Sequence, residues 1–415
     1  MNCEWIETTL GAIVTLQRGH DLPSQRRNAG HIPIMGSGGI TGYHDSATTK
    51  GPGVVIGRSG VGSMGIVSYI DRDYWALNTT LYVKNFHGKD EKFVYYLLKT
   101  INFRQYDTGS AQSSLNRNLI YPHKVFLPKT LAAQRKISSV LTALDDRIAL
   151  LHQTNITLEA IAQTLFKSWF VDFDPVRAKL EGRILEGMDE ATAALFPENF
   201  EESESELALI PTGWRVGTLQ DLATLNPESW TLKAHPDAIQ YIDLANTKNN
   251  NISETELFQF GDAPSRARRV LRAGDSIIGT VRPGNRSFAY IYSGANNLTG
   301  STGFAVLRPI NQKNAEFIFI AATQNSSIDH LAHVADGGAY PAVRPEVVAG
   351  IKVVLPSDAV TDAFHKIVFP IFSLVGENKI QAQTLVSLRD TLLPRLISGQ
   401  LRLPEAETIL EEAIA

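Results

Sequence analysis

Two stretches of the sequence, around 131–170 and 367–392, carry the periodicity of long paired helices, and this restricts the fold more than any other feature. In both stretches apolar residues recur alternately every three and four positions, which is the a/d pattern of a coiled-coil seam. The first stretch has leucine at its d positions. A helix of roughly 40 residues spans about 60 Å, which is too long for an ordinary core helix.

The two helices are predicted to pair and to hold two other domains at a fixed distance. Two unrelated amphipathic helices, each inside its own core, would give the same pattern. Asn155 and Asn378 each occupy an a position, where a polar residue fixes the register of a coiled coil. The residues predicted to form the seam are Leu141, Leu144, Ile148, Leu151, Asn155, Leu158, Leu165, Ile371, Leu374, Asn378, Leu385, Leu388 and Leu392.

One order of sequence features occurs twice, which indicates two copies of a single structural unit. Trp5 or Trp214 stands near the start of each copy, and an apolar run with a central glycine, Gly57 or Gly279, follows. Each copy continues with an alternating run, an apolar helical segment and a Leu-Pro pair that precedes a long helix. Each unit is therefore predicted to be a mixed domain followed by a long helix.

The predicted fold class is α+β, with two similar α/β domains and two long helices that pair as an antiparallel coiled coil. Short alternating runs broken by Gly, Pro and Asn indicate mostly antiparallel sheets in both domains. The segment between the two copies contains prolines and a glutamate run, and is interpreted as a solvated connection. The expected divisions are a first mixed domain at 1–130, a long helix at 131–174, a linker at 175–212, a second mixed domain at 213–357, a long helix at 358–402 and a tail at 403–415.

The sequence motifs give no positive sign of an enzyme. The G-x-G-x-x-G run at 60–65 precedes an alternating apolar segment rather than a helix, so a glycine-rich hairpin is expected instead of a nucleotide site. His330 and His333 have no carboxylate or cysteine cluster beside them in sequence, so no metal site is expected. The single Cys3 fits a reducing cytoplasm, and no apolar run reaches membrane-spanning length.

Two Gly-rich polar surfaces are candidates for contact with DNA, because Arg, Asn, Gln and Ser side chains read bases and phosphates. Solvated loops without a ligand would have the same composition. The arginines between 266 and 286 are expected to form a phosphate-facing patch. The candidates are Ser37, Tyr43, His44, Arg58, Ser59, Gln112, Ser113, Asn116 and Arg117 on the first surface, and Arg266, Arg268, Arg269, Arg282, Arg286, Tyr340 and Arg344 on the second.

Several strings resemble a known family. LFKSWFVDFDPVRAKLEG (165–182) and SLRDTLLPRLISGQLRLP (387–404) resemble the segments that follow the conserved helices in specificity subunits of type I restriction–modification systems. IPIMGSGGITGYHD, GPGVVIGRSG and ALNTTLYV resemble one type of target-recognition domain in that family. The resemblance covers almost the whole chain. It implies a non-catalytic subunit in which each mixed domain reads one half of a split, asymmetric DNA site and the paired helices set the unread spacer.

The same resemblance implies the partners. They are double-stranded DNA, two methyltransferase subunits that use S-adenosylmethionine to methylate adenine, and restriction subunits driven by ATP and Mg²⁺. No cofactor is expected in this chain itself, and the cytoplasm is the expected location. Two alternatives stay open: a self-sufficient DNA methyltransferase, whose cofactor and Asn-Pro-Pro-aromatic motifs are missing from the sequence, and a protein-only scaffold without DNA contact.

Overall fold

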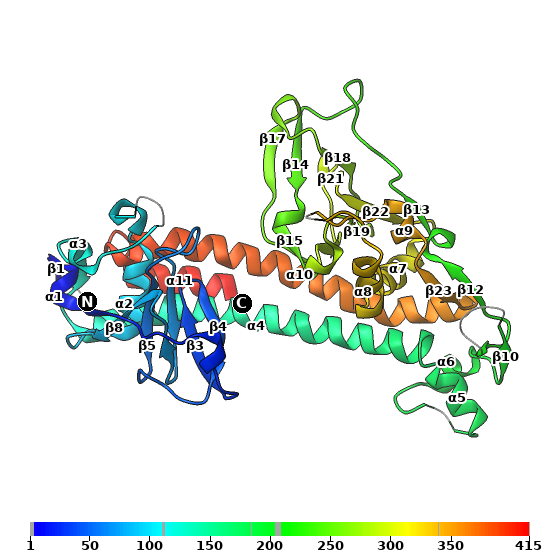
Figure 1. Ribbon diagram of the computed structural model, residues 1–415, viewed down its shortest axis with the longest axis horizontal. Helices are drawn as coiled ribbons and strands as arrows, with labels where there is room; N and C mark the ends of the chain where they lie inside the picture. The colour runs from blue at the N-terminus through cyan, green and yellow to red at the C-terminus, as the bar shows by residue number, and fades with distance from the viewer. Residues whose placement is uncertain (1–3, 110–112, 184, 204–208, 339, 415) are drawn as a thin grey trace. The chain divides into compact units, whose positions relative to one another are not determined.

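The computed structural model describes residues 4–109, 113–183, 185–203, 209–338 and 340–414. The chain divides into two compact units, of which unit 1 is Met1–Leu151 with Gln381–Ala415 and unit 2 is His152–Ile380. The long helices α4 (Leu131–Phe170) and α10 (Asp358–Ile397) each contribute one stretch to unit 1 and one to unit 2 (Figure 1). Each unit therefore contains a mixed domain and its own part of the helix pair.

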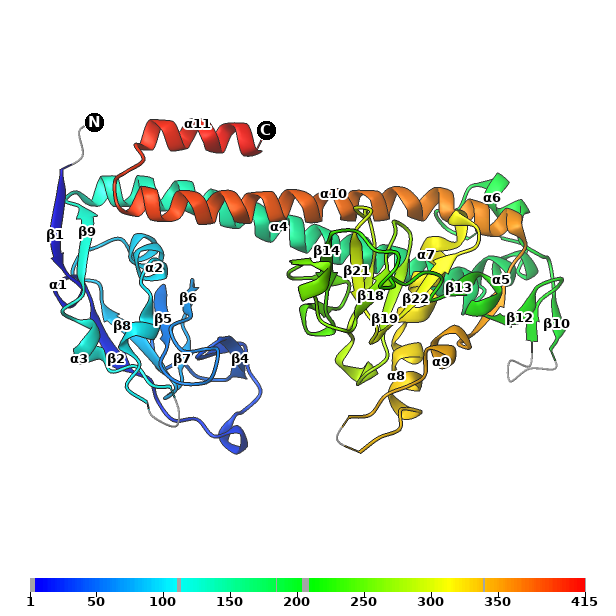
Figure 2. The same cartoon turned by 90° about the horizontal axis from the view of Figure 1, so that it is seen from above.

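Unit 1 consists of two small sheets, a two-stranded ribbon and short helices beside its stretch of the helix pair. Its remaining elements are β1 (Trp5–Thr9), α1 (Leu10–Ile13), β2 (Thr15–Arg18), η1 (Ser24–Arg26), β3 (Ile32–Gly36), β4 (Gly39–His44), β5 (Gly53–Gly57), β6 (Val67–Ile70), β7 (Trp75–Ala76), β8 (Thr80–Asn85), α2 (Glu91–Lys99), η2 (Phe103–Tyr106), α3 (Arg117–Ile120), β9 (Lys124–Pro128) and α11 (Leu403–Ile414). Helix α2 lies between the sheet that contains β5 and the helix pair (Figure 2).

Unit 2 repeats this plan with additional short strands and 3-10 helices. Its remaining elements are α5 (Asp174–Leu180), α6 (Glu190–Ala194), β10 (Phe200–Glu202), β11 (Leu209–Pro211), β12 (Arg215–Thr218), η3 (Leu219–Asp221), β13 (Ala223–Leu225), β14 (Ala238–Ile242), η4 (Leu244–Asn246), β15 (Thr247–Lys248), β16 (Asn251–Ile252), β17 (Glu256–Gln259), η5 (Phe260–Asp262), β18 (Ala267–Val270), β19 (Ser276–Gly279), η6 (Pro283–Asn285), β20 (Phe288–Tyr290), β21 (Leu298–Ser301), β22 (Phe304–Pro309), η7 (Gln312–Asn314), α7 (Ala315–Thr323), α8 (Asn325–His333), α9 (Pro345–Ala349) and β23 (Lys352–Leu355).

The sheet topology confirms the predicted fold class and internal repeat. The ribbon β1·β9 of unit 1 corresponds to β12·β23 of unit 2, and the sheet β2-β8-β5-β6 corresponds to β13-β22-β19-β20. The second sheets are β4-β3-β7 and β17-β14-β21-β18, and each contains one parallel pair, β3·β7 or β14·β21. The G-x-G-x-x-G run at 60–65 lies in the turn between the antiparallel strands β5 and β6, as the hairpin interpretation predicted.

The two long helices pair antiparallel within unit 2 through one buried polar contact and an aromatic cluster. The Asn378 side-chain amide donates to Asn155 Oδ1 over 2.8 Å, and the Asn155 amide donates to the Val375 carbonyl over 3.3 Å. Further along α4, the Phe166 ring lies 6.0 Å from Phe364, which comes earlier in α10. In unit 1, Arg389 Nη1 donates to Asp145 Oδ1 over 2.8 Å.

The contact between Asn155 and Asn378 predicts that a double substitution is less harmful than a single one. Replacing Asn155 alone by leucine leaves the buried Asn378 amide without its partner, at a cost of about 1–3 kcal/mol. Replacing both asparagines by leucine removes the polar requirement and is expected to raise the melting temperature above that of the single variant. Thermal unfolding of the two variants measures this. A single variant as stable as the double would contradict the pairing.

One predicted seam residue, Leu374, lies outside the seam. Its side chain is 42% exposed, whereas the next residue, Val375, is fully buried. The buried stripe of α10 is displaced here because the helix also packs on its own domain, with the Phe372 ring 4.9 Å from Tyr290 and 5.8 Å from Phe319. The other predicted seam residues are buried or half-buried: Leu141, Leu144, Ile148, Leu151, Asn155, Leu158, Leu165, Ile371, Asn378, Leu385, Leu388 and Leu392.

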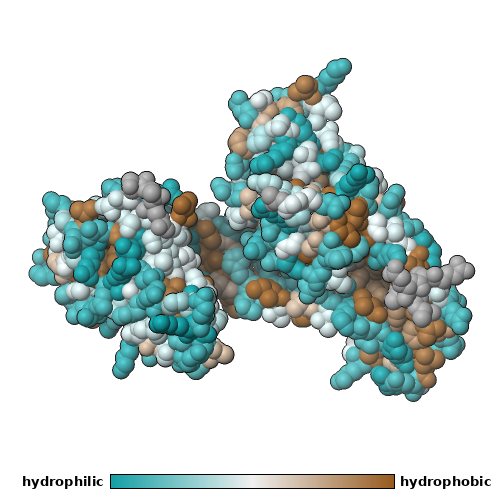
Figure 3. Space-filling view, viewed as in Figure 1, coloured by the Kyte–Doolittle hydropathy of each residue, from teal (hydrophilic) through white to brown (hydrophobic). Residues whose placement is uncertain are grey.

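The segment predicted as a solvated linker is folded over much of its described length. It contains α5, α6 and the antiparallel ribbon β10·β11, and Val176, Phe196 and Ile210 are buried in the core of unit 2. These apolar residues outweigh the prolines and glutamates that suggested a connection, while part of the glutamate run, 204–206, lies outside the described residues. Figure 3 shows hydrophobic surface over this segment, where Leu180 and Leu209 are each 54% exposed.

The C-terminal tail is also structured, because α11 packs on unit 1. Ala406 is fully buried in its core, and Ile409 and Leu410 pack against the same core. Helix α10 is long and apolar enough to span a membrane by composition, but 44% of its most apolar stretch is buried inside the protein. A single helix of this kind is weak evidence for a membrane span, because partly buried core helices have the same length and composition.

Candidate nucleic-acid interface

A basic hollow of about 690 Å³ opens on the surface of unit 2. It is lined by η4 and β15, by the loop between β19 and β20, and by Tyr340. Three cations, Lys248, Arg282 and Arg286, line it, and its described lining contains no carboxylate. The hollow therefore suits an anionic ligand with polar edges.

The loop between β19 and β20 owes its shape to the sequence Val-Arg-Pro-Gly-Asn-Arg. Pro283 opens the short helix η6, and residues on both sides of that helix adopt left-handed backbone, with φ 47° at Arg282 and 60° at Arg286. The Arg282 N–H donates to the Pro341 carbonyl over 2.7 Å, and the Val343 N–H donates to Thr280. These bonds fasten the loop to the segment that carries Tyr340.

Arg286 is held by neutral acceptors. Its Nε donates to Asn249 Oδ1 over 2.8 Å, and its Nη1 donates to Asn325 Oδ1 over 3.0 Å. Its guanidinium also lies over the Phe288 ring, 5.3 Å from the centroid. Amide oxygens fix the group without neutralising it, and no carboxylate of the described residues forms an ion pair with Arg286.

The predicted arginine patch divides into two groups, because the three arginines of the 266–269 segment do not line the hollow. Arg266 forms an ion pair with Asp243 over 2.5 Å, and its Nε donates to the Tyr241 hydroxyl. Arg268 donates to the Ala267 carbonyl and lies over the Phe260 ring. Burial lowers the pKa of Arg269, which donates to Ser229 Oγ over 3.3 Å. These contacts hold the three arginines beside β18, and a phosphate contact by any of them stays a prediction.

In unit 1, Arg58 follows β5 directly and lies close to Arg18. Burial, and next the positive charge of Arg18, lower the pKa of Arg58. Arg18 Nε donates to the Asn78 carbonyl, and Arg117 Nη1 donates to the Leu16 carbonyl over 2.9 Å. Within the described ranges, none of these three arginines forms an ion pair with a carboxylate, so unit 1 also carries cations that lack a partner of opposite charge.

Three other candidates, His44, Ser37 and Asn116, form hydrogen bonds within unit 1. His44 is 5% exposed, its Nδ1 accepts from the Asn28 N–H, and its ring makes an edge contact with Trp75, so this side chain is part of the packing of unit 1. Ser37 Oγ donates to the Thr79 carbonyl over 2.7 Å. Asn116 caps α3 by accepting from the Asn118 N–H.

The remaining candidates differ in exposure. Tyr43 and Tyr340 are 56% and 73% exposed, and Arg344 is an exposed residue at the start of α9. Ser59 forms a backbone bridge with Ser114, and Ser113 bonds to Asp107. Gln112 lies outside the described residues.

Sequence reasoning missed four residues that shape these sites: Arg18, Lys248, Asn249 and Asn325. The asparagine run at 249–251 gave a signal, since asparagine tolerates left-handed backbone, and Asn249 and Asn250 both adopt it. The role of Asn325 arises from a contact between distant segments. No local pattern in the sequence contains that information.

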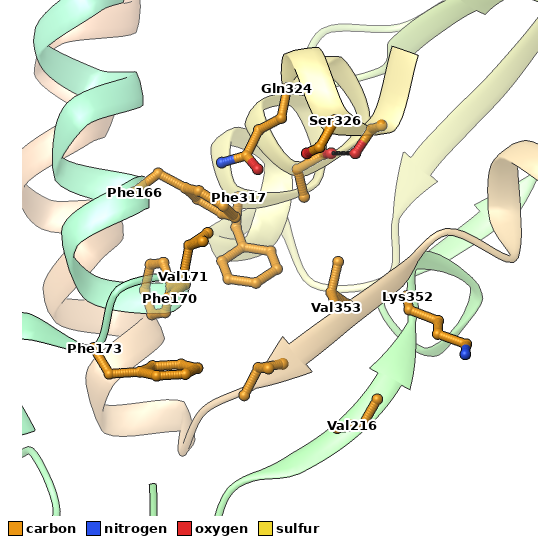
Figure 4. A pocket seen from close by; sticks show the side chains of 13 residues that line it. Phe166, Phe170, Val171, Phe173, Val216, Phe317, Gln324, Ser326, Lys352 and Val353 are labelled. Carbon is orange, nitrogen blue, oxygen red and sulfur yellow. Dashed lines mark hydrogen bonds between the residues drawn. The ribbon is translucent and has the colours of Figure 1, made fainter. Parts of the chain in front are cut away.

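Another hollow in unit 2, of about 260 Å³, is apolar and offers little chemistry. Figure 4 shows Phe166 and Phe170 of the last turns of α4 beside Phe317, with Phe173, which follows α4, also on the lining. Lys352 is the single charged residue of its described lining. In the described part of the chain, no group of three or more His, Cys, Asp or Glu side chains is arranged to hold a metal ion.

Comparisons with known proteins agree with this architecture. A family model described as "Type I restriction modification DNA specificity domain" matches residues 2–160. The chain is 30% identical to the type I restriction enzyme HindI specificity subunit of Haemophilus influenzae over 314 residues, covering 65% of this chain and 67% of that protein. It is 24% identical to the MjaIX specificity subunit of Methanocaldococcus jannaschii, over 79% of this chain and 74% of that protein.

A solved structure shares the fold. The type I restriction–modification S subunit from M. genitalium superposes with a TM-score of 0.56 at 17% sequence identity, over 95% of this chain and 96% of that chain. At this identity the likeness concerns the fold alone.

Proposed function

Because the chain belongs to the specificity subunits of type I restriction–modification systems, we propose that its two mixed domains each read one half of a bipartite, asymmetric DNA site. The observation that carries the proposal is a repeated position: Arg58 follows β5, and the loop with Arg282 and Arg286 follows β19, which is the equivalent strand of the repeat. Arginine beside a strand end, in a polar and glycine-rich loop, suits both phosphate contact and base-edge contact.

The paired helices, in this proposal, set the unread spacer and dock two methyltransferase subunits, which restriction subunits join. Support comes from apolar side chains that the helices leave exposed, since exposed apolar surface marks sites of protein association. These residues are Ile156, Ile161, Phe369, Leu374 and Ile380. S-adenosylmethionine, ATP and Mg²⁺ belong to the partner subunits, this chain supplies no catalysis, and the complex works in the cytoplasm.

Independent reading predicts that substitutions in one unit alter one half of the site only. Arg58→Ala is expected to weaken recognition of one half-site, and Arg282→Ala that of the other. The loss of a base contact should lower the discrimination between bases at one position by roughly 1–3 kcal/mol. Selection of bound or methylated sites from random DNA by the complete methyltransferase complex measures both. Arg72→Ala and Arg215→Ala serve as controls, because both arginines are exposed and already paired, with Asp71 and Asp221.

Three outcomes would contradict the proposal. A single substitution that alters both half-sites would exclude independent readers. Binding without sequence preference and without a steep salt dependence would favour a protein-only scaffold. Methylation by the isolated chain would favour a self-sufficient methyltransferase.

A further inference from the structure

Backbone strain gathers beside the basic hollow of unit 2. Non-glycine residues with positive φ are uncommon, and the described chain has them at His87, Phe173, Asn226, Asn249, Asn250, Arg282 and Arg286. Of these, Arg282 and Arg286 line the hollow, and Asn249 and Asn250 directly follow its lining residue Lys248. Asparagine adopts this conformation readily, but arginine lacks a short side chain that bonds to its own backbone. Such residues persist where the surrounding structure imposes them, and they cluster at functional sites.

The strained loop presents two arginines in different surroundings. Arg286 is fixed through two of its nitrogens by Asn249 and Asn325, which come from separate elements. A guanidinium that is pre-oriented by neutral acceptors keeps its full charge and loses little freedom when an anion binds. A phosphate, with its diffuse negative charge and several acceptor oxygens, matches such a group.

Arg282 is placed differently, at the rim of the hollow. Its guanidinium lies over the Tyr340 ring, 4.7 Å from the centroid, and Tyr340 is 73% exposed. The hydrogen bond from the Arg282 N–H to the Pro341 carbonyl joins the backbone of the arginine to the backbone beside Tyr340. A guanidinium that lies on a ring directs its N–H groups outward along its edge, which is the geometry that reads the two acceptors of guanine in the major groove.

We propose that Arg286 anchors a DNA backbone phosphate and that Arg282, supported by Tyr340, reads a base edge in the half-site of unit 2. This division of roles rests on the proposed function of the chain as a DNA reader. It goes further by assigning affinity to one arginine and sequence preference to the other, although the two are separated only by the residues of η6.

The test measures the affinity of the complete complex, with its methyltransferase subunits, for DNA duplexes. The duplexes carry the selected site or single-base variants of it, and each is titrated at several salt concentrations. Arg286→Gln should weaken binding to all duplexes by a similar factor, roughly tenfold, and should flatten the salt slope by about one unit. Arg286→Lys should restore the slope, because it restores the charge. Arg282→Gln should leave the slope nearly unchanged and reduce discrimination at one base pair by roughly tenfold or more.

Tyr340→Phe keeps the ring beneath Arg282 and should behave as wild type, whereas Tyr340→Leu should relax the same base pair as Arg282→Gln. Thermal melting confirms that each variant is folded. If Arg286→Gln changed one base preference and Arg282→Gln weakened all duplexes equally, the assigned roles would be wrong. If none of these variants changed binding while the wild-type complex still selected its site, this proposal alone would be overturned. A wild-type complex without any sequence preference would overturn the proposed function.

Discussion

Replacing Leu144 by aspartate is expected to abolish the pairing of the helices in unit 1 and with it the assembly of the methyltransferase complex. Leu144 is fully buried in the cluster that also contains Leu385 and Leu392 of α10. The substitution removes a buried leucine and places a carboxylate among apolar side chains, at a cost of at least about 3 kcal/mol. Thermal unfolding and co-purification with the methyltransferase subunits measure the two effects.

Leu150→Asp is the matched control. Leu150 lies on the same helix and in the same unit, but its side chain is 54% exposed, so the same substitution should change stability by no more than about 0.5 kcal/mol. Equal stability of the two variants would show that the seam does not hold the helices together. If both variants were stable but only Leu150→Asp lost the methyltransferase subunits, the exposed face and not the seam would control assembly.

The seam and the repeat were predictable because both depend on patterns that a linear sequence records. The 3–4 spacing marks the helices over many turns, and the order from Trp5 to the Leu-Pro pair recurs from Trp214 onward. The displacement at Leu374 was not predictable in this way. It arises because Phe372 packs on Tyr290, and only the folded domain brings that second surface to α10.

The candidate site was predictable as a region but not residue by residue. Arg266 and Arg286 look alike in sequence, yet one is neutralised by Asp243 and the other is held by Asn249 and Asn325. Their partners lie on other strands and helices, so charge balance is decided by tertiary contacts. His44 illustrates the same limit, since a polar residue in a glycine-rich run is buried against Trp75.

Each mixed domain is fixed to its stretch of the helix pair by polar contacts, as the proposed role of the helices in setting the spacer requires. In unit 1, Ser138 Oγ on α4 donates to Asp90 at the start of α2, and Tyr96 of α2 donates to Asp145 of α4. In unit 2, Asn250 donates to Glu159 of α4 over 2.7 Å and accepts, through its carbonyl, from Lys379 of α10.

Burial raises the pKa of Glu159 and lowers that of Lys379, and the opposite charge of each group stabilises the charged form of the other. A domain fastened in this way should move with the helix segment that carries it. A rotation or translation of that segment should therefore displace the loops that follow β5 and β19 by a similar amount.

Lengthening both helices by four residues is therefore expected to lengthen the unread spacer of the DNA site without changing either half-site. Copies of 149–152 and of 380–383 would be inserted after those segments, where α4 and α10 pass from one unit to the other. Four residues add about 6 Å and about 40° beyond a full turn, and a base pair rises about 3.4 Å, so the spacer should grow by one or two base pairs. Such an insertion is a stutter, which unwinds a coiled coil locally without destroying it.

The paired insertion is required because two polar contacts flank the site of insertion. Asp145 with Arg389, and Asn155 with Asn378, are both retained when the two helices lengthen together. An insertion in α4 alone sets the two contacts out of register, so it should lower the melting temperature and impair assembly. Selection of bound sites from random DNA then measures the spacer length directly. An unchanged spacer in the paired variant would mean that the helices do not set the distance, and a changed half-site would mean that the helices themselves take part in reading bases.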